Sequence, residues 1–120
     1  MASKEPWVPE RGEVIWMNFN PSGGGQEMAD EHPMLVLSTR IFNDRTSLVI
    51  GLPMTHAESN KTNPFAVEYT FKGHTGYFLT HQPKSFDWRK RGAKQHTWGK
   101  IPELLLQKAC EALNDIIQIG

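Results

Sequence analysis

Two histidines with polar neighbours are the residues of this chain best suited to chemistry. His32 stands between Glu31 and Pro33, directly before an apolar run. His81 ends an alternating segment and is followed by Gln82-Pro83-Lys84-Ser85. Imidazole has an unperturbed pKa of about 6.5, so it can accept or donate a proton near neutral pH. Each of these histidines is therefore a candidate general acid or base.

Groups that can bind a phosphate or a base lie in the same segments. Thr55 ends the run Leu52-Pro53-Met54-Thr55, where its hydroxyl and nearby backbone amides can hold a phosphate. An isolated threonine at a strand end more often bonds its own backbone, so that reading stays open. Lys84 can contact a phosphate, and Gln82 can read a base edge or sit as a polar residue inside a barrel.

Cationic and aromatic residues offer weaker signals for nucleic-acid binding. Arg89, Lys90, Arg91 and Lys94 form a local cationic run. Such a run can hold an RNA backbone, but it is more often a solvated face. Several aromatic residues can stack on unpaired bases, although they more often belong to a core or an interface: Trp7, Phe86, Trp88 and Trp98. Trp16 is expected in the core or at a dimer interface.

Composition excludes several classes of protein. The 13 basic and 13 acidic residues cancel, which argues against a protein that coats nucleic acid by bulk charge. The single Cys110 excludes an internal disulfide, and no apolar run is long enough to cross a membrane. No zinc-ligand spacing occurs, so we expect no metal and no cofactor. A polar start without a signal core predicts a cytoplasmic protein with a flexible segment over residues 1–10.

The pattern of apolar residues predicts one mainly β domain over residues 1–120 with a C-terminal α-helix. Short apolar or alternating runs predict strands near 12–19, 34–38, 47–54, 65–69 and 76–80. Residues 20–31 should form a long mobile loop, 42–45 a helical turn or loop, and 72–74 a tight connection. From Pro102 the apolar residues recur at the spacing of an amphipathic helix. Together these elements favour a small, strongly curved antiparallel sheet covered by the helix.

Four motifs in this order resemble the MazF/PemK family of toxins. They are Arg11-Gly12-Glu13-Val14-Ile15-Trp16, Glu31-His32-Pro33, Leu52-Pro53-Met54-Thr55 and His81-Gln82-Pro83-Lys84-Ser85, and the resemblance runs from about Arg11 to Ile119. It implies an SH3-like β-barrel of the CcdB/MazF type. It also implies a homodimeric, metal-independent endoribonuclease that cuts single-stranded RNA, leaving 2′,3′-cyclic phosphate and 5′-hydroxyl ends. The implied partner is a small antitoxin with an acidic disordered tail.

The resemblance also suggests roles for individual residues. His32 stands where the family usually has an arginine, and His81 stands where it usually has an aspartate. With Thr55 of the Pro-x-Thr step, these two form the expected catalytic set. Glu27 matches a loop glutamate of many members, and Glu31 stands where some have histidine; a carboxylate there would raise the pKa of a neighbouring imidazole. The expected substrate-binding residues are Glu27, Glu31, Gln82, Lys84, Ser85, Arg89 and Arg91.

Two other functions stay open. The exchange of arginine and aspartate for His32 and His81 can also describe a weakened member that binds RNA or antitoxin without cutting. The fold-related CcdB toxins act on DNA gyrase through a C-terminal helix end, and the apolar tail over residues 116–120 can dock on a partner in that way. The polar motifs favour the nuclease.

Overall fold

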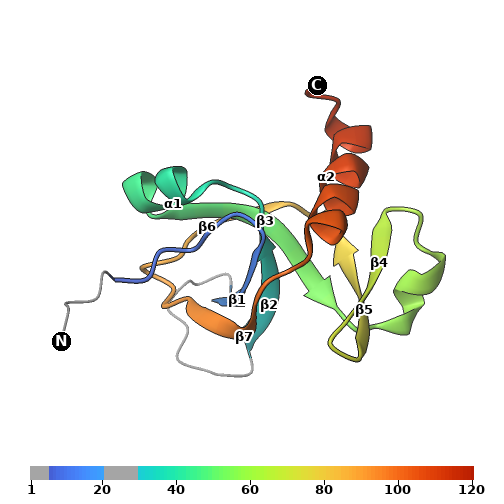
Figure 1. Ribbon diagram of the computed structural model, residues 1–120, viewed down its shortest axis with the longest axis horizontal. Helices are drawn as coiled ribbons and strands as arrows, with labels where there is room; N and C mark the ends of the chain where they lie inside the picture. Colours follow the sequence, from blue (N-terminus) through green and yellow to red (C-terminus); the bar gives the residue numbers. More distant parts are fainter. Residues whose placement is uncertain (1–5, 21–29) are drawn as a thin grey trace.

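The chain folds into one curved antiparallel sheet with two α-helices (Figure 1). The structure is a computed structural model, and it describes residues 6–20 and 30–120. The sheet follows the order β4-β5-β3-β2-β1-β7, and β6 pairs separately with β3. In chain order the elements are β1 (Glu13–Asn18), β2 (Glu31–Val36), α1 (Arg40–Thr46), β3 (Leu48–Thr55), the 3₁₀ helix η2 (Glu58–Thr62), β4 (Ala66–Phe71), β5 (His74–Leu79), β6 (Lys84–Asp87), β7 (Lys94–Lys100) and α2 (Glu103–Ile117). This is the mainly β class with a C-terminal helix that the sequence predicts.

Strand β3 is the long central strand that joins the two halves of the sheet (Figure 1). One of its edges pairs with β2, while β6 and then β5 share the other edge. The strand comes so close to β2 at Gly51 that a Cβ there would lie 2.1 Å from the carbonyl oxygen of Leu35. Glycine is therefore required at this close approach of β3 to β2, where Gly51 also pairs with Lys84 of β6 on its other edge.

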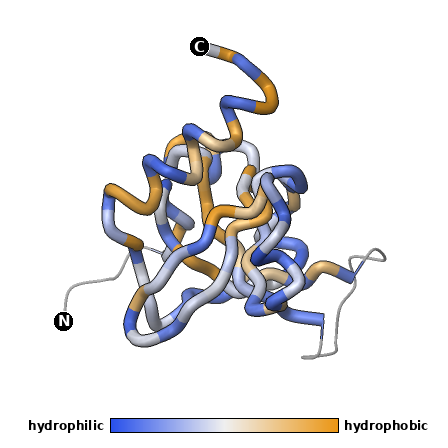
Figure 2. The backbone as a smooth tube through the Cα atoms, turned by 90° about the vertical axis from the view of Figure 1, so that its right-hand side faces the viewer, coloured by the Kyte–Doolittle hydropathy of each residue, from blue (hydrophilic) through white to orange (hydrophobic). Residues whose placement is uncertain are grey.

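Hydrophobic residues cover both faces of the central strands. Val14 and Ile15 are neighbours on β1, yet both are fully buried, as the apolar pattern of that segment predicts. The Val14 face packs under α2, whose Leu106 and Ala109 are buried against it. The opposite face is closed by a second cluster that includes Met34 and Trp88. Figure 2 shows hydrophobic stretches recurring within the sheet and along α2 to the C-terminal end.

Asn43 on α1 is a fully buried polar residue that joins three segments. Its Nδ2 donates to the carbonyl oxygens of Pro9 at 2.9 Å and Ser38 at 3.2 Å, and its own carbonyl accepts from Trp88 Nε1 at 2.9 Å. Asn43→Ala removes the side-chain donors and leaves the Pro9 carbonyl without its partner, so we expect a loss of about 1–3 kcal/mol in the free energy of unfolding. Urea denaturation measures this loss. Asn60→Ala is the control, because the Asn60 amide makes an exposed bond, and an equal loss in both variants would contradict the prediction.

Two parts of the sequence prediction need correction. Residues 6–10 were expected to be flexible, but Val8 and Pro9 are buried and Trp7 Nε1 donates to the Glu13 carboxylate at 3.0 Å. Strands β6 and β7 were not predicted, because β6 is only four residues long and the β7 sequence KQHTWGK is mostly polar and shows no clear alternation. By contrast, the tight connection over residues 72–74 is confirmed: Lys72 and Gly73 have positive φ angles of 51° and 78°, as a two-residue hairpin turn requires. Most of the loop predicted over 20–31 lies outside the described residues.

Candidate functional site

His32 lies exposed on β2, opposite Met17 of β1. Residues alternate along a strand, so its side chain shares a face with Met34 and Val36 of the same strand. The imidazole meets the ring of Phe19 edge-on at a centroid distance of 5.7 Å, and Phe19 meets Phe86 of β6 at 5.1 Å. Phe19 was not singled out from the sequence, although its alternation with Met17 places it on this face.

Thr55 ends β3 on the same face of the sheet. Met34 of β2 pairs with Pro53 of β3, and continuing this register by two residues brings His32 level with Thr55. Met54 belongs to the core under α2, so the alternate residue Thr55 faces the side of His32. The Thr55 hydroxyl accepts from the Ala57 N–H at 3.1 Å, which is the local backbone bond left open from the sequence. The hydroxyl hydrogen is still available to a ligand, because this bond uses only a lone pair.

Strand β6 brings Lys84 to the same face. Lys84 pairs with Gly51 and Phe86 pairs with Val49, so the side chain of Lys84 lies on the Phe86 side and that of Ser85 on the other. His32, Thr55 and Lys84 therefore come from three neighbouring strands and share one surface. We call this surface, with Phe19 and Phe86, the His32 face.

His81 and Gln82 lie in the connection between β5 and β6. The connection is a turn in which the Gln82 N–H donates to the Leu79 carbonyl at 3.1 Å, and both side chains are exposed. The His81 ring lies 6.2 Å from that of Phe65, and its Nε2 lies 3.2 Å from Gln82 Nε2. Within residues 6–20 and 30–120, no hydrogen bond or ring contact links His81 to His32. A direct histidine pair is therefore not formed, and joint action on one substrate stays a prediction.

Both arginines of the cationic run are held by the protein. Arg91 donates to the carbonyl oxygens of Asn18 and Asn20, each at 2.9 Å, and its guanidinium lies 4.2 Å from the centroid of Phe86. This fixes a positive charge beside the His32 face. Arg89 instead pairs with Asp44 of α1 at 2.8 Å and stacks on Trp88, farther along the molecule. Arg91 is thus the better placed of the two to meet a phosphate near His32.

Glu31 points away from its neighbour His32. It opposes Asn18 of β1 and forms an ion pair with Lys94 Nζ at 3.1 Å, with the carboxylate side chain only 15% exposed. A carboxylate beside an imidazole was considered from the sequence, but its charged partner here is an ammonium group. Glu27 lies outside the described residues.

A row of aromatic rings crosses the other face of the sheet. Trp16 stacks on His96 with 4.7 Å between centroids, His96 meets Trp98 at 5.1 Å, and Trp98 meets Phe71 at 5.4 Å. Trp7, by contrast, packs against Trp88 at 5.7 Å in the second hydrophobic cluster, so these two tryptophans serve the fold. Trp16 is half-buried rather than enclosed in the core.

The stacked position of His96 has a consequence for stability. Burial lowers the pKa of His96 below its ordinary value, because the charged form is disfavoured there. The unfolded chain then takes up this proton at a higher pH than the folded chain, so the contribution of His96 is complete above about pH 6.5 and decreases as the pH falls. We expect His96→Gln to reduce the dependence of the unfolding free energy on pH between 7 and 5. Urea denaturation across this range measures it, and an unchanged slope would contradict the assignment.

Two negative findings apply to the described ranges 6–20 and 30–120. No group of three or more His, Cys, Asp or Glu side chains is arranged to hold a metal ion there. No helix in those ranges has the length and apolar character needed to cross a membrane.

Comparisons with known proteins agree with this fold. A family described as the PemK-like, MazF-like toxin of type II toxin–antitoxin systems matches residues 10–117. The endoribonuclease toxin MazF of Escherichia coli K12 is 36% identical over 103 residues, which cover 86% of this chain and 90% of that protein. The endoribonuclease PemK of Escherichia coli is 29% identical over 111 residues, covering 90% of this chain and 81% of PemK.

Solved structures give the same result. A crystal structure of MazF from Deinococcus radiodurans superposes with a TM-score of 0.79 at 31% identity, covering 95% of this chain and all of that one. A MazE–MazF crystal structure from the same organism gives a TM-score of 0.76 at 28% identity, covering 96% of this chain and all of its match. The sequence motifs, the curved sheet with its terminal helix and these matches lead to one conclusion: the chain belongs to the PemK-like, MazF-like family of toxins of type II toxin–antitoxin systems.

Proposed function

We propose that this chain is the toxin of a type II toxin–antitoxin pair and acts as a metal-independent endoribonuclease on single-stranded RNA in the cytoplasm. The observation that carries the proposal is the His32 face, where a histidine, a hydroxyl and a lysine from three adjacent strands lie beside an anchored arginine. The curated relatives named endoribonuclease MazF and PemK support this reaction class.

Metal-independent RNA cleavage needs a base, a stabiliser of charge and an acid, and these residue types match the three needs. A base takes the proton of the ribose 2′-hydroxyl, whose oxygen attacks the adjacent phosphorus. The phosphorane carries extra negative charge, which Arg91 and Lys84 can stabilise while the Thr55 hydroxyl donates to a phosphate oxygen. An acid then protonates the departing 5′-oxygen. The products are a 2′,3′-cyclic phosphate and a 5′-hydroxyl.

The two proton transfers are assigned to His32 and His81. His81 is proposed as the base and His32 as the acid, with the RNA strand passing from the β5–β6 connection across the end of β3. Single-stranded RNA is the proposed substrate because in-line attack requires a more flexible backbone than an A-form helix provides, and because its bases are free to be read. Gln82 beside His81 supplies a further contact to the strand, whereas the Ser85 side chain lies on the other face of β6.

The test is cleavage of a long single-stranded RNA in EDTA, with the ends of the products mapped. The wild-type protein, His32→Ala and His81→Ala are compared from pH 5 to 9, and we expect a bell-shaped rate profile that loses one limb in each variant. Binding without cleavage would identify the weakened member considered above. Inhibition of gyrase supercoiling with RNA left intact would instead support the CcdB-like function.

The proposed partner is an antitoxin whose acidic, disordered tail folds over the His32 face and displaces RNA. Three of the structural neighbours are MazE–MazF complexes, which supports a partner of this kind. Production of the toxin alone should arrest growth, and production together with its antitoxin should restore it. Failure of the antitoxin to compete with RNA in vitro would exclude a shared surface.

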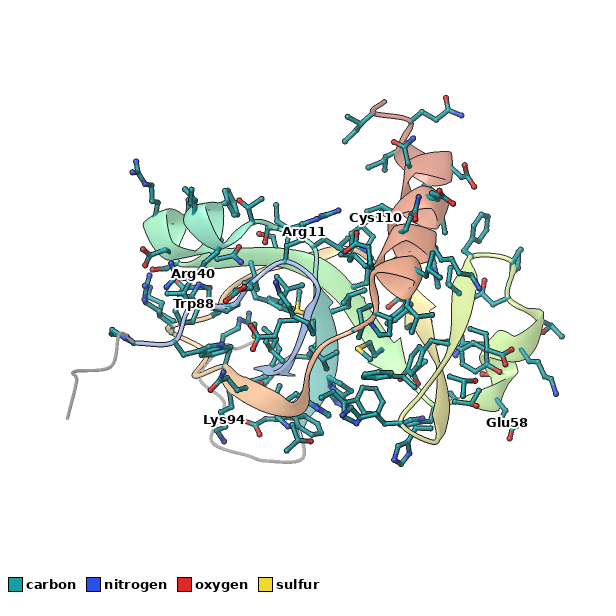
Figure 3. The ribbon with its side chains drawn as sticks, viewed as in Figure 1. Arg11, Arg40, Glu58, Trp88, Lys94 and Cys110 are labelled. Atoms are coloured by element: carbon teal, nitrogen blue, oxygen red, sulfur yellow. The ribbon has the colours of Figure 1, made fainter. Side chains whose placement is uncertain are left out.

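A homodimer is proposed through the apolar groove between α2 and the sheet. The groove has a volume of about 340 Å³, and its apolar lining is Leu37, Ile50, Leu113, Ile117 and Ile119. Arg11 stands at this groove beside Cys110, with 3.3 Å between Nη2 and Sγ (Figure 3). Three isoleucines of the groove are exposed, Ile119 by 83% of its surface, and a second copy would cover them.

Ile117→Glu is expected to convert the dimer to monomer, because it buries an unpaired charge in the proposed interface. Light scattering coupled to size exclusion measures the mass. Leu104→Glu is the control, since Leu104 is 74% exposed on the first turn of α2 and does not line the groove. A wild-type mass of one chain, or equal dissociation by both variants, would exclude this interface.

A further inference from the structure

A second hollow lies on the face of the sheet opposite to His32. It has a volume of about 500 Å³ and is lined by Trp16, Glu31, Lys94 and Gln95. These residues come from β1, β2 and β7, where Trp16 pairs with Lys94 and Asn18 pairs with Glu31. Figure 3 shows Lys94 at β7, away from the helix and its apolar groove. We call this hollow the Trp16 pocket.

The indole of Trp16 is held in place before any ligand arrives. One side stacks on His96 with an interplanar angle of 25°, and His96 is in turn packed edge-on against Trp98. An aromatic ring fixed in this way loses little conformational freedom when a flat ligand stacks on it. Stacking of a base on an aromatic side chain contributes about 1–3 kcal/mol and is common in the binding of single-stranded nucleic acid. Trp16 therefore supplies a platform suited to a nucleobase.

The ion pair of Glu31 and Lys94 supplies polar groups to the same pocket. The ammonium and the carboxylate lie 3.1 Å apart, and Lys94 remains 56% exposed. Together they offer one donor group, the ammonium, next to two acceptor oxygens. Guanine has the complementary Watson–Crick edge, with the acceptor O6 followed by the donors N1–H and N2–H. Adenine, cytosine and uracil each lack two adjacent donors on that edge.

We propose that the Trp16 pocket is a base-specific subsite for guanine in single-stranded RNA. In it the purine stacks on Trp16, Lys94 donates to O6, and the Glu31 carboxylate accepts from N1–H and N2–H. The inference rests on the proposed ribonuclease function, since Glu31 and His32 are neighbours at the start of β2 on opposite faces, and an RNA strand that passes around this end of the sheet can place one base in the pocket and another nucleotide at the His32 face. An apolar side chain of a protein partner fits less well, because it would desolvate the ion pair without replacing its hydrogen bonds.

The test is titration of the ¹⁵N-labelled full chain with guanosine, inosine, adenosine, cytidine and uridine 5′-monophosphates. The Trp16 indole N–H resonance, assigned with Trp16→Phe, is the readout. All five nucleotides carry the same phosphate, so differences among them report the base. Inosine lacks only the N2 amino group of guanosine, and the loss of one charge-assisted hydrogen bond should weaken binding at least about tenfold.

Variants sharpen the test. Glu31→Gln and Lys94→Gln should each remove the preference for guanosine. Trp16→Leu should weaken binding of every base, which is followed in this variant through the backbone amide resonances of Lys94 and Gln95. Lys100→Gln is the control, because Lys100 lies on the same strand but pairs with Glu10 outside the pocket. Equal shifts from all five nucleotides, no shift of Trp16, or a guanosine preference that survives Glu31→Gln would overturn the proposal.

Binding and cleavage are measured separately, so the two proposals fail in different ways. If RNA is cut but guanosine monophosphate is not preferred at Trp16, the subsite is wrong and the ribonuclease assignment stands. If RNA is not cut, the titration still decides whether the pocket selects guanine.

Discussion

Replacing His32 by alanine is expected to reduce the rate of RNA cleavage by about 10²–10⁴-fold, the usual contribution of a positioned acid or base. The imidazole is exposed on β2 and held edge-on by Phe19, which is itself packed against Phe86. Alanine removes the proton donor without opening the core, because His32 is not part of either hydrophobic cluster. Single-turnover cleavage under saturating protein measures the chemical step, and circular dichroism confirms that the variant is folded.

Two further histidine variants separate the roles. His74→Ala is the matched control, since His74 is also exposed and lies on β5 away from the His32 face, so its cleavage rate should equal that of the wild type. His32→Arg restores the residue that the family usually carries. We expect it to recover much of the rate by stabilising charge, but without the pH limb that the histidine provides. Full activity of His32→Ala would show that another group transfers the proton.

The architecture could be predicted where apolar residues follow a clear period. Strands β1, β3 and β5 bury most of their apolar residues, and helix α2 packs one apolar stripe that includes Leu106 and Ala109 on the core, so the spacing of these residues reflects the core directly. Strand β7 could not be predicted from the apolar pattern, because it is an edge strand that pairs with β1 and its side chains are mostly polar. The ordered packing of residues 6–10 could not be predicted, because it depends on partners distant in sequence, such as Asn43, which donates to the Pro9 carbonyl.

The candidate site could be predicted by residue type but not by arrangement. The motifs identified His32, Thr55 and His81, yet sequence order says nothing about which strand edge faces which. The position of His81 depends on β5 and β6 sharing one edge of β3, a long-range pairing. The two arginines of the cationic run have different positions for a similar reason. Arg91 is fixed by carbonyl groups more than 70 positions earlier in the chain, while Arg89 is bound by Asp44 of α1.

Phe78→Ala is expected to lower the free energy of unfolding by about 3–5 kcal/mol, a large part of the total stability of a domain of this size. Phe78 is fully buried, stacks on Tyr69 at 4.6 Å and pairs with Met54, the residue before Thr55. Its loss leaves a cavity at the junction of β3, β4 and β5 that the paired strands cannot close by collapsing.

Thermal and urea denaturation measure the effect, and Phe78→Leu is the control, because it keeps most of the volume and should lower the free energy of unfolding clearly less.

The ionisation of Tyr69 gives an independent readout of the cavity. Burial raises its pKa to about 12, so its neutral form stabilises the fold and this contribution is lost as the pH rises from about 10 through 12. A cavity that admits water beside Tyr69 should bring its ionisation, followed by ultraviolet absorbance, to a lower pH. Because Met54 fixes the end of β3, cleavage by Phe78→Ala should fall even below its unfolding temperature. If stability falls while cleavage by the folded variant is unchanged, Thr55 is positioned by β2 rather than by the core under α2.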